Sequence, residues 1–216
     1  MGDLEVQLAG LRSVLCLGAH VDDIEIGCGG TLIHLLELHS EIEIHWVVLS
    51  APDGRAAEAR HSAETLLGNA RKVDVRVAGF EETLFPHLGR DLKGYIAHLG
   101  LELEPDLVLT HWSGDLHQDH RAVNEFTWNT FRDHLILEYE IPKWDGDMGR
   151  PNVYVPLDKP VCERKVQHLL DAFPSQAGKP WFDPEVFWGL LRLRGMEARS
   201  PSGYAEAFHC RKLVLS

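Results

Sequence analysis

Hydrophobic and polar positions along the chain follow two patterns, one typical of buried strands and one typical of helices, and these patterns alternate. Four runs have the apolar or alternating character of buried strands: residues 13–19, 41–50, 73–80 and 105–111. Three segments between them carry apolar residues at helical spacing: residues 31–40, 56–68 and 91–104. This alternation predicts an α/β protein with a mostly parallel sheet and helices on both faces.

The second half of the chain continues with both kinds of element. The pattern predicts helices at 121–135, 160–173 and 184–197, and strands at 135–141 and 152–157. The 216 residues contain no repeat, no low-complexity tract and no linker long enough to divide domains. We therefore expect a single domain spanning 1–216.

Charge and cysteine content narrow the class of protein. Lys and Arg number 21 against 33 Asp and Glu, a net charge of −12, which argues against nucleic acid as a partner. No window approaches the roughly 20 apolar residues of a membrane span, and the N-terminus lacks the basic and apolar regions of a signal peptide. The four cysteines are far apart in the sequence and form no disulfide framework. This pattern is typical of proteins in a reducing compartment. We expect a cytoplasmic protein with no membrane span.

Two short groups of histidine and aspartate follow predicted strands. HVDD (20–23) comes directly after the first strand, and HQDH (117–120) lies in the loop after the fourth. Ligands collect at the carboxyl ends of parallel strands, so these groups are expected to meet. Imidazole and carboxylate are good zinc ligands, and a catalytic zinc site typically uses three. Of two adjacent carboxylates, one can bind metal while the other acts as general base.

Each group alone has a simpler interpretation. Aspartates at a strand-to-helix junction commonly cap the helix, and histidines in a loop commonly face solvent. Two such groups, both at strand ends, are hard to explain as capping twice. Their combination favours a metal site.

Three segments resemble the zinc-dependent de-N-acetylases of the LmbE-like, or PIG-L-like, family: AHVDD (19–23), RHSAE (60–64) and THWSGDLHQDH (110–120). A weaker similarity continues in GYAEAF (203–208). The resemblance implies a three-layer, Rossmann-like fold and one LmbE-like deacetylase domain over the whole chain. Val21 and Gln118 stand where that family often has proline, which removes no ligand.

The resemblance also implies roles for the two groups. His20, Asp23 and His120 would ligate zinc, or iron(II), which similar ligands also accept. Asp22 would be the general base that activates the attacking water. His117 would stabilise the oxyanion or protonate the leaving amine.

Three further residues take supporting roles by the same resemblance. Asp119 would orient a metal-ligating imidazole from behind. Arg60 and Trp112 would lie at the substrate end of the site. The simpler interpretation of Arg60 is a solvent-exposed residue on a helix, and that of Trp112 is a residue packed in the core.

The reaction implied by the resemblance removes an N-acetyl group from an N-acetylglucosamine-type sugar or its conjugate. Its partner would be a small-molecule amino-sugar conjugate, and family resemblance favours a trimer or hexamer. A different acylamide on a non-sugar substrate, or a non-catalytic metal-binding module, are the alternatives. A dinucleotide-dependent oxidoreductase is disfavoured because residues 17–30 lack G-x-G-x-x-G, and a serine hydrolase because G-x-S-x-G is absent.

Overall fold

The computed structural model describes residues 8, 10–39, 41–52, 54–68 and 70–214. Its strands form one sheet in the order β3-β2-β1-β4-β5-β7-β6. The strands are β1 (Ser13–Gly18), β2 (Glu43–Val48), β3 (Lys72–Val77), β4 (Leu107–His111), β5 (Leu135–Tyr139), β6 (Val153–Pro156) and β7 (Ala205–His209). The helices are α1 (Asp23–Leu38), α2 (Ala56–Leu66), α3 (Gly89–Glu102), α4 (Gln118–Thr130), α5 (Lys159–Ala172) and α6 (Pro184–Glu197), with a 3-10 turn at Pro174–Gln176.

The first five strands are parallel, as the β–α alternation predicts. From β1, the chain builds outward to β2 and β3 on one side and then crosses to β4 and β5 on the other. In such sheets the crevice at this change of direction is where ligands bind. The order of strands therefore points to the carboxyl ends of β1 and β4.

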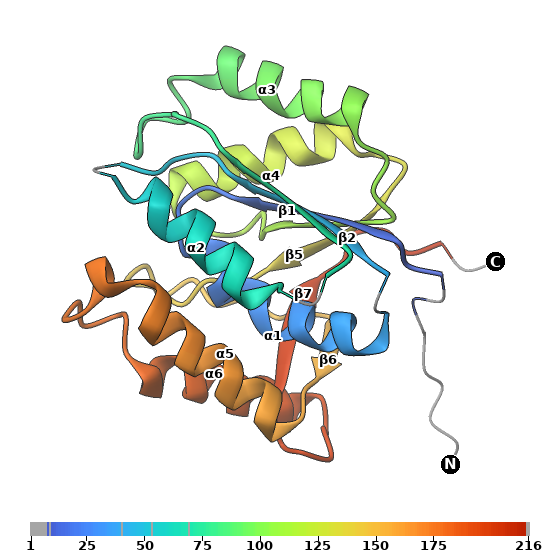
Figure 1. The fold of residues 1–216 in the computed structure, drawn as a ribbon, viewed down its shortest axis with the longest axis vertical. Helices are drawn as coiled ribbons and strands as arrows, with labels where there is room; N and C mark the ends of the chain where they lie inside the picture. The colour runs from blue at the N-terminus through green and yellow to red at the C-terminus, as the bar shows by residue number, and fades with distance from the viewer. Residues whose placement is uncertain (1–7, 9, 40, 53, 69, 215–216) are drawn as a thin grey trace.

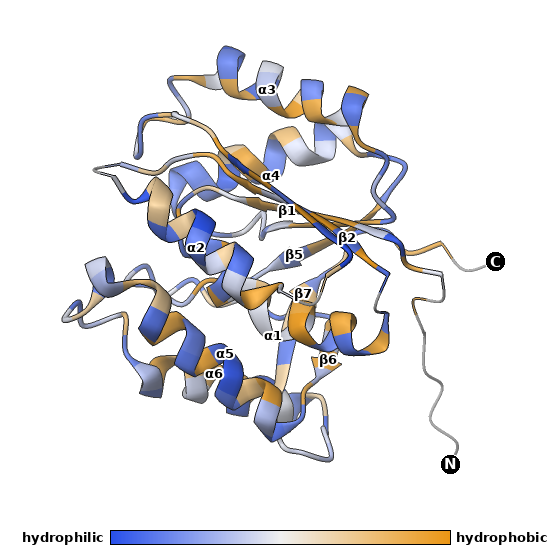
Figure 2. Cartoon of the chain, in the orientation of Figure 1, coloured by the Kyte–Doolittle hydropathy of each residue, from blue (hydrophilic) through white to orange (hydrophobic). Residues whose placement is uncertain are grey.

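Helices cover both faces of the sheet, which confirms the predicted three-layer α/β architecture. Helices α1, α2, α5 and α6 lie on one face and α3 and α4 on the other (Figure 1). Side chains along β1 alternate between the two cores: Val14 and Cys16 belong to the first, and Leu15 and Leu17 to the second. Figure 2 shows β1 as a largely hydrophobic strand between these layers.

Helix α1 begins earlier than the pattern predicts. The expected helix starts at residue 31, whereas α1 starts at Asp23 and includes Gly27, Gly29 and Gly30. A Cβ atom at Gly27 would overlap the ring of Tyr139, so a larger residue would push α1 away from the sheet. These glycines allow close packing rather than marking a loop.

The last strand is also absent from the sequence prediction. Strand β7 is antiparallel to both β5 and β6, and it lies between them. The sheet is therefore mostly, not wholly, parallel. Among the helices that the structure describes, none combines the length and the apolar character needed to cross a bilayer.

Candidate metal and catalytic site

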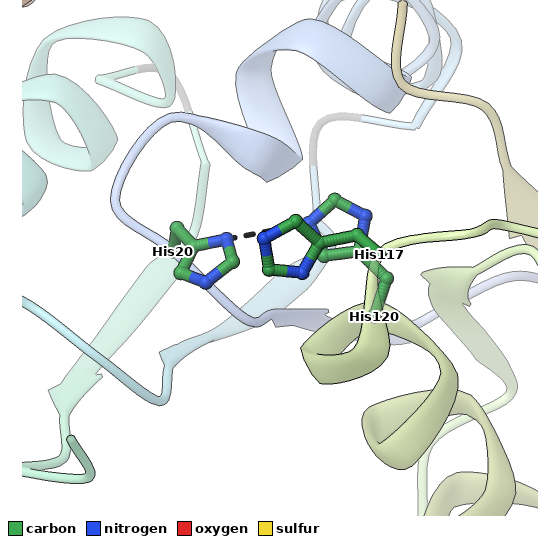
Figure 3. A group of neighbouring side chains, drawn as sticks. All are labelled: His20, His117 and His120. Carbon is green, nitrogen blue, oxygen red and sulfur yellow. Dashed lines mark hydrogen bonds between the residues drawn. The ribbon is translucent and has the colours of Figure 1, made fainter. Parts of the chain in front are cut away.

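The two predicted histidine and aspartate groups lie side by side at the carboxyl edge of the sheet. HVDD (20–23) follows β1 and enters the first turn of α1, and HQDH (117–120) starts α4 after β4. Strands β1 and β4 are parallel neighbours, so both segments leave the sheet at the same edge. Figure 3 shows His20 from the first segment facing His117 and His120 from the second.

Donor atoms of the three residues assigned as metal ligands lie close to one another in pairs. His20 Nδ1 lies 3.3 Å from both His120 Nε2 and Asp23 Oδ2, and Asp23 Oδ1 lies 3.5 Å from His120 Nε2. Zinc–ligand bonds of about 2.0–2.2 Å in a tetrahedral arrangement separate ligand atoms by about 3.3–3.6 Å. The pairwise distances between these buried side chains are of that size, and Asp23 faces His20 through Oδ2 and His120 through Oδ1.

Two more histidines, His117 and His111, each belong to a group of three side chains whose ligand atoms lie close together. The ligand atoms of His20, His117 and His120 lie within 4.8 Å of one another, as do those of Asp23, His111 and His120. His111 is the last residue of β4 and is fully buried, with Nε2 3.3 Å from Asp23 Oδ2. No role for His111 was predicted from the sequence, where its position at the end of a predicted strand was the only signal.

The imidazoles of His20 and His120 each contact a carboxylate through the ring nitrogen that faces away from the cluster. His20 Nε2 lies 3.1 Å from Asp119 Oδ2, and His120 Nδ1 lies 2.9 Å from Asp115 Oδ2. Asp115 also pairs with Lys143 at 2.9 Å. Such partners select the ring tautomer and hold the ring orientation in metal sites. The resemblance suggested this role for Asp119, whereas Asp115 was missed although it lies five residues before His120.

The two imidazoles differ in their affinity for protons. Burial disfavours charge on His20, but the carboxylates of Asp23 and Asp119 outweigh it and raise the pKa of His20 to about 10. Burial and the neighbouring His111 lower the pKa of His120 to about 3. In the metal-free protein His20 is therefore cationic at neutral pH, and His120 is neutral.

Asp22 occupies the N-cap position of α1 but makes no capping hydrogen bond through its side chain. Its carboxylate instead lies 3.3 Å from the guanidinium of Arg55, in the loop before α2. Burial and the negative charge of Asp23 raise the pKa of Asp22, while Arg55 opposes the rise. Asp22 is therefore a buried carboxylate with increased basicity, facing the pocket rather than the helix end.

His117 caps α4 through one ring nitrogen. Its Nδ1 accepts the backbone N–H of Asp119 at 3.3 Å. Burial and the positive charge of His20 lower the pKa of His117, so the ring is neutral at pH 7 in the metal-free protein. With Nδ1 as acceptor, the neutral ring carries its proton on Nε2. His117 thus offers one hydrogen-bond donor on the pocket side.

A pocket of about 240 Å³ opens above the cluster. Its walls come from residues 141–145, after β5, and from Gln176, Lys179 and Trp181, between α5 and α6. Trp144 is 73% exposed at the rim, and Lys179 Nζ lies 5.8 Å over the ring of Trp181. Two aromatic rings and several charged groups therefore surround the path to the cluster.

The structure does not bring the two expected substrate residues to this pocket. Arg60 is exposed on α2 and donates to the carbonyl oxygen of Val75 at 3.0 Å. Trp112 stacks on His209 with ring centroids 4.4 Å apart. Arg55, five residues before Arg60, lines the pocket instead.

Fold and site together define a class of protein: a three-layer α/β protein with a buried His/Asp cluster at its topological switch point. Comparison of the sequence with protein families agrees with this class. The family described as PIG-L, GlcNAc-PI de-N-acetylase, matches residues 15–131, more than half of the chain. The chain belongs to this family. No curated protein sequence matches it significantly.

Solved structures with the same fold include proteins of different activity. The N,N'-diacetylchitobiose deacetylase from Pyrococcus horikoshii matches with a TM-score of 0.71 and 19% identity, over 93% of this chain and 84% of its own. A 4-carboxy-2-hydroxymuconate hydratase from Pseudomonas putida has a TM-score of 0.74 and 18% identity, over 95% and 98%. The conserved protein TT1542 from Thermus thermophilus has a TM-score of 0.74 and 19% identity, over 95% and 97%. These likenesses establish the fold alone.

Proposed function

We propose that the protein is a zinc-dependent N-deacetylase that hydrolyses the acetamido group of an N-acetylglucosamine-type sugar or its conjugate. The observation that carries this proposal is the pairwise spacing of 3.3–3.5 Å among His20 Nδ1, His120 Nε2 and the two carboxylate oxygens of Asp23. Family membership supports the reaction, because the family is described by a de-N-acetylase activity.

His20, Asp23 and His120 are the residues that would hold the ion. When bound, zinc supplies an acidified water and polarises the carbonyl group of the amide. Iron(II) accepts similar ligands. Asp119 and Asp115, hydrogen-bonded to the far nitrogens of the two imidazoles, would keep the donor nitrogens directed at the ion.

Asp22 is the general base of the proposed mechanism. It lines the pocket beside Asp23, and its side chain makes no cap that would engage it elsewhere. Its increased basicity suits it to take a proton from the attacking water, and Arg55 at 3.3 Å stabilises the charged form before the transfer. The proton is then available for the departing nitrogen.

His117 is the proposed oxyanion donor. Because Nδ1 accepts a backbone hydrogen bond, Nε2–H of the neutral ring can donate to the carbonyl oxygen as negative charge develops there. Protonation of the leaving amine would require the cationic ring. The lowered pKa of His117 therefore favours the oxyanion role.

The pocket walls support a sugar substrate. The exposed ring of Trp144 and the partly buried ring of Trp181 offer flat apolar surfaces, which suit the faces of a sugar ring. Lys179 adds a positive charge beside Trp181. A solved structure of the same fold carries the name of a deacetylase of N,N'-diacetylchitobiose, itself an acetamido sugar.

We also propose a cytoplasmic location and assembly into a homo-oligomer, a trimer or hexamer. The four free cysteines support a reducing compartment. The negative net charge supports a small-molecule substrate rather than a nucleic acid.

The test is a screen of zinc-loaded protein against acetamido sugars, including nucleotide-linked and lipid-linked forms, with release of free amine as the readout. Turnover that a chelator abolishes and added zinc restores is the expected result. Turnover only on non-sugar acylamides would overturn the substrate class. Tight zinc binding without amine release from any acylamide would indicate a non-catalytic binding module.

A further inference from the structure

A buried ion pair from the C-terminal third of the chain contacts the backbone of α1. Lys165 on α5 and Glu206 on β7 are paired, and their side chains are 5% and 4% exposed. Glu206 accepts the N–H of Gly30 at 2.8 Å and that of Thr31 at 2.6 Å. Lys165 Nζ donates to the carbonyl oxygen of Ile26 at 2.6 Å. Both charges thus interact with one turn of a neighbouring helix.

These contacts involve the two backbone groups that normally bond to each other. In a regular α-helix the N–H of Gly30 donates to the carbonyl oxygen of Ile26. Here Lys165 donates to that carbonyl oxygen, and Glu206 accepts that N–H. The ion pair therefore contacts both backbone groups of this step within the continuous helix Asp23–Leu38, and it ties the turn to α5 and β7.

Gly30 makes room for this arrangement. A Cβ atom there would lie 2.6 Å from Leu157 and 2.9 Å from Glu206 Oε1. A side chain at residue 30 would displace Glu206 from the backbone of α1. Glycine is therefore needed at this position for the ion pair to reach the helix.

The bridged turn leads directly to the catalytic segment. The N–H of Ile26 donates to the carbonyl oxygen of Asp22 at 3.0 Å, and its carbonyl oxygen is the one held by Lys165. Ile26 also lines the pocket beside Asp22 and Asp23. A shift of this turn would move both carboxylates relative to His120, which is anchored on α4.

Stability alone is a weak explanation for the pair. Burying two charges carries a large desolvation penalty, and an apolar pair of similar volume is often as stable or more so. Apolar side chains would also make no contact with the backbone carbonyl oxygen of Ile26 or the N–H of Gly30. What the ion pair supplies is a defined geometry for the first two turns of α1.

We propose that Lys165 and Glu206 are positioning residues that hold the Asp22–Asp23 segment in register with the histidines of α4. The proposal rests on the proposed function, since it assigns Asp23 to the metal and Asp22 to the water. It also gives a role to the GYAEAF segment, which contains Glu206 and lies outside residues 15–131 matched by the family.

The test measures Co²⁺ binding and the visible absorption of the bound ion, together with thermal stability. Glu206→Gln removes the charge while keeping the side-chain shape. It is expected to weaken Co²⁺ binding about 10-fold or more, the size of effect seen for residues that support metal ligands. It is also expected to change the cobalt absorption spectrum. Lower thermal stability with unchanged affinity and spectrum would overturn the proposal.

A double variant, Lys165→Met with Glu206→Leu, separates positioning from stability. Replacing both charges should restore thermal stability, because no unpaired charge stays buried. The proposal expects Co²⁺ affinity to stay weakened in this variant, since no side chain then ties Ile26 and Gly30 to α5 and β7. Recovery of wild-type affinity and spectrum along with stability would overturn it. If Glu206→Gln does not fold, this variant alone decides.

The matched control is another buried ion pair in the same part of the molecule. Arg194 and Glu140 form a bidentate ion pair with hydrogen bonds of 2.7 and 2.9 Å, and both side chains are 4% exposed. Glu140→Gln should lower stability but leave Co²⁺ affinity unchanged; an equal loss of affinity would contradict the proposal. A wild-type protein that binds Co²⁺ yet hydrolyses no acylamide would refute the proposed function and leave the positioning test intact.

Discussion

Asp119 and His20 form a hydrogen bond of 3.1 Å between Oδ2 and Nε2 that joins the start of α4 to the end of β1. The same carboxylate accepts the backbone N–H groups of Thr83 at 2.6 Å and Phe85 at 3.2 Å. These donors hold the carboxylate in a fixed direction. As a result, Asp119 directs the Nδ1 atom of His20 toward Asp23 and His120.

Asp119→Ala is therefore expected to weaken zinc binding by about 10- to 100-fold, because His20 loses the group that selects its tautomer and orientation. The measurement is competition for Zn²⁺ with a chromophoric chelator. Asp74→Ala is the matched control: Asp74 lies 3.4 Å from His45, a histidine–aspartate pair on β2 and β3. Unchanged zinc affinity in Asp119→Ala would show that the carboxylate does not support the metal.

Asp22→Asn separates proton transfer from metal binding. The amide keeps the size of the side chain but cannot accept the proton from water, so kcat should fall by about 10²- to 10⁴-fold. Zinc content, measured by atomic absorption, should stay near one ion per chain. His20→Ala is the comparison, and it should lose the ion itself. Near-normal turnover by Asp22→Asn would remove Asp22 from the role of general base.

Arg55→Gln should shift the pH dependence of the reaction. The guanidinium at 3.3 Å lowers the pKa of Asp22, so its removal raises that pKa further. Because the base must be ionised, the acid limb of the kcat/KM profile should move to higher pH. Arg60→Gln is the control, since Arg60 is exposed and donates to Val75. A shift in Arg60→Gln, and none in Arg55→Gln, would restore the substrate-end role that the resemblance gave Arg60.

The parallel strands were predictable because hydrophobic periodicity reports burial directly. Runs such as residues 13–19 are apolar on both faces, as a central strand requires. The start of α1 and strand β7 were not predicted, for different reasons. The first turns of α1 contain three glycines, which usually indicate a loop, but here Gly27 allows contact with Tyr139 and Gly30 allows contact with Leu157 and Glu206. Strand β7 has only five residues, and its place between β5 and β6 depends on long-range pairing.

The cluster of HVDD and HQDH was predictable because both segments follow parallel strands that end at one edge. The contact of Arg55 was not predictable, since Arg55 lies 33 positions after Asp22 and the chain between them includes a strand and a loop whose path no local pattern specifies. Asp115 was not predicted either. Its contact with His120 depends on the fold of the loop before α4, where its Oδ1 accepts the N–H of His117 at 2.8 Å.

Zinc affinity should depend on pH through His20. Asp23 and Asp119 raise the pKa of His20 to about 10, so at neutral pH its imidazole holds a proton that must leave before Nδ1 can bind the ion. Affinity should therefore rise about tenfold per pH unit between pH 7 and 8, with about one proton released per ion. His120, with a pKa of about 3, contributes none in this range. Calorimetry in buffers of different ionisation enthalpy measures the proton count. A count near zero would mean that His20 is already neutral, and that the carboxylates around it do not hold the charge that the geometry implies.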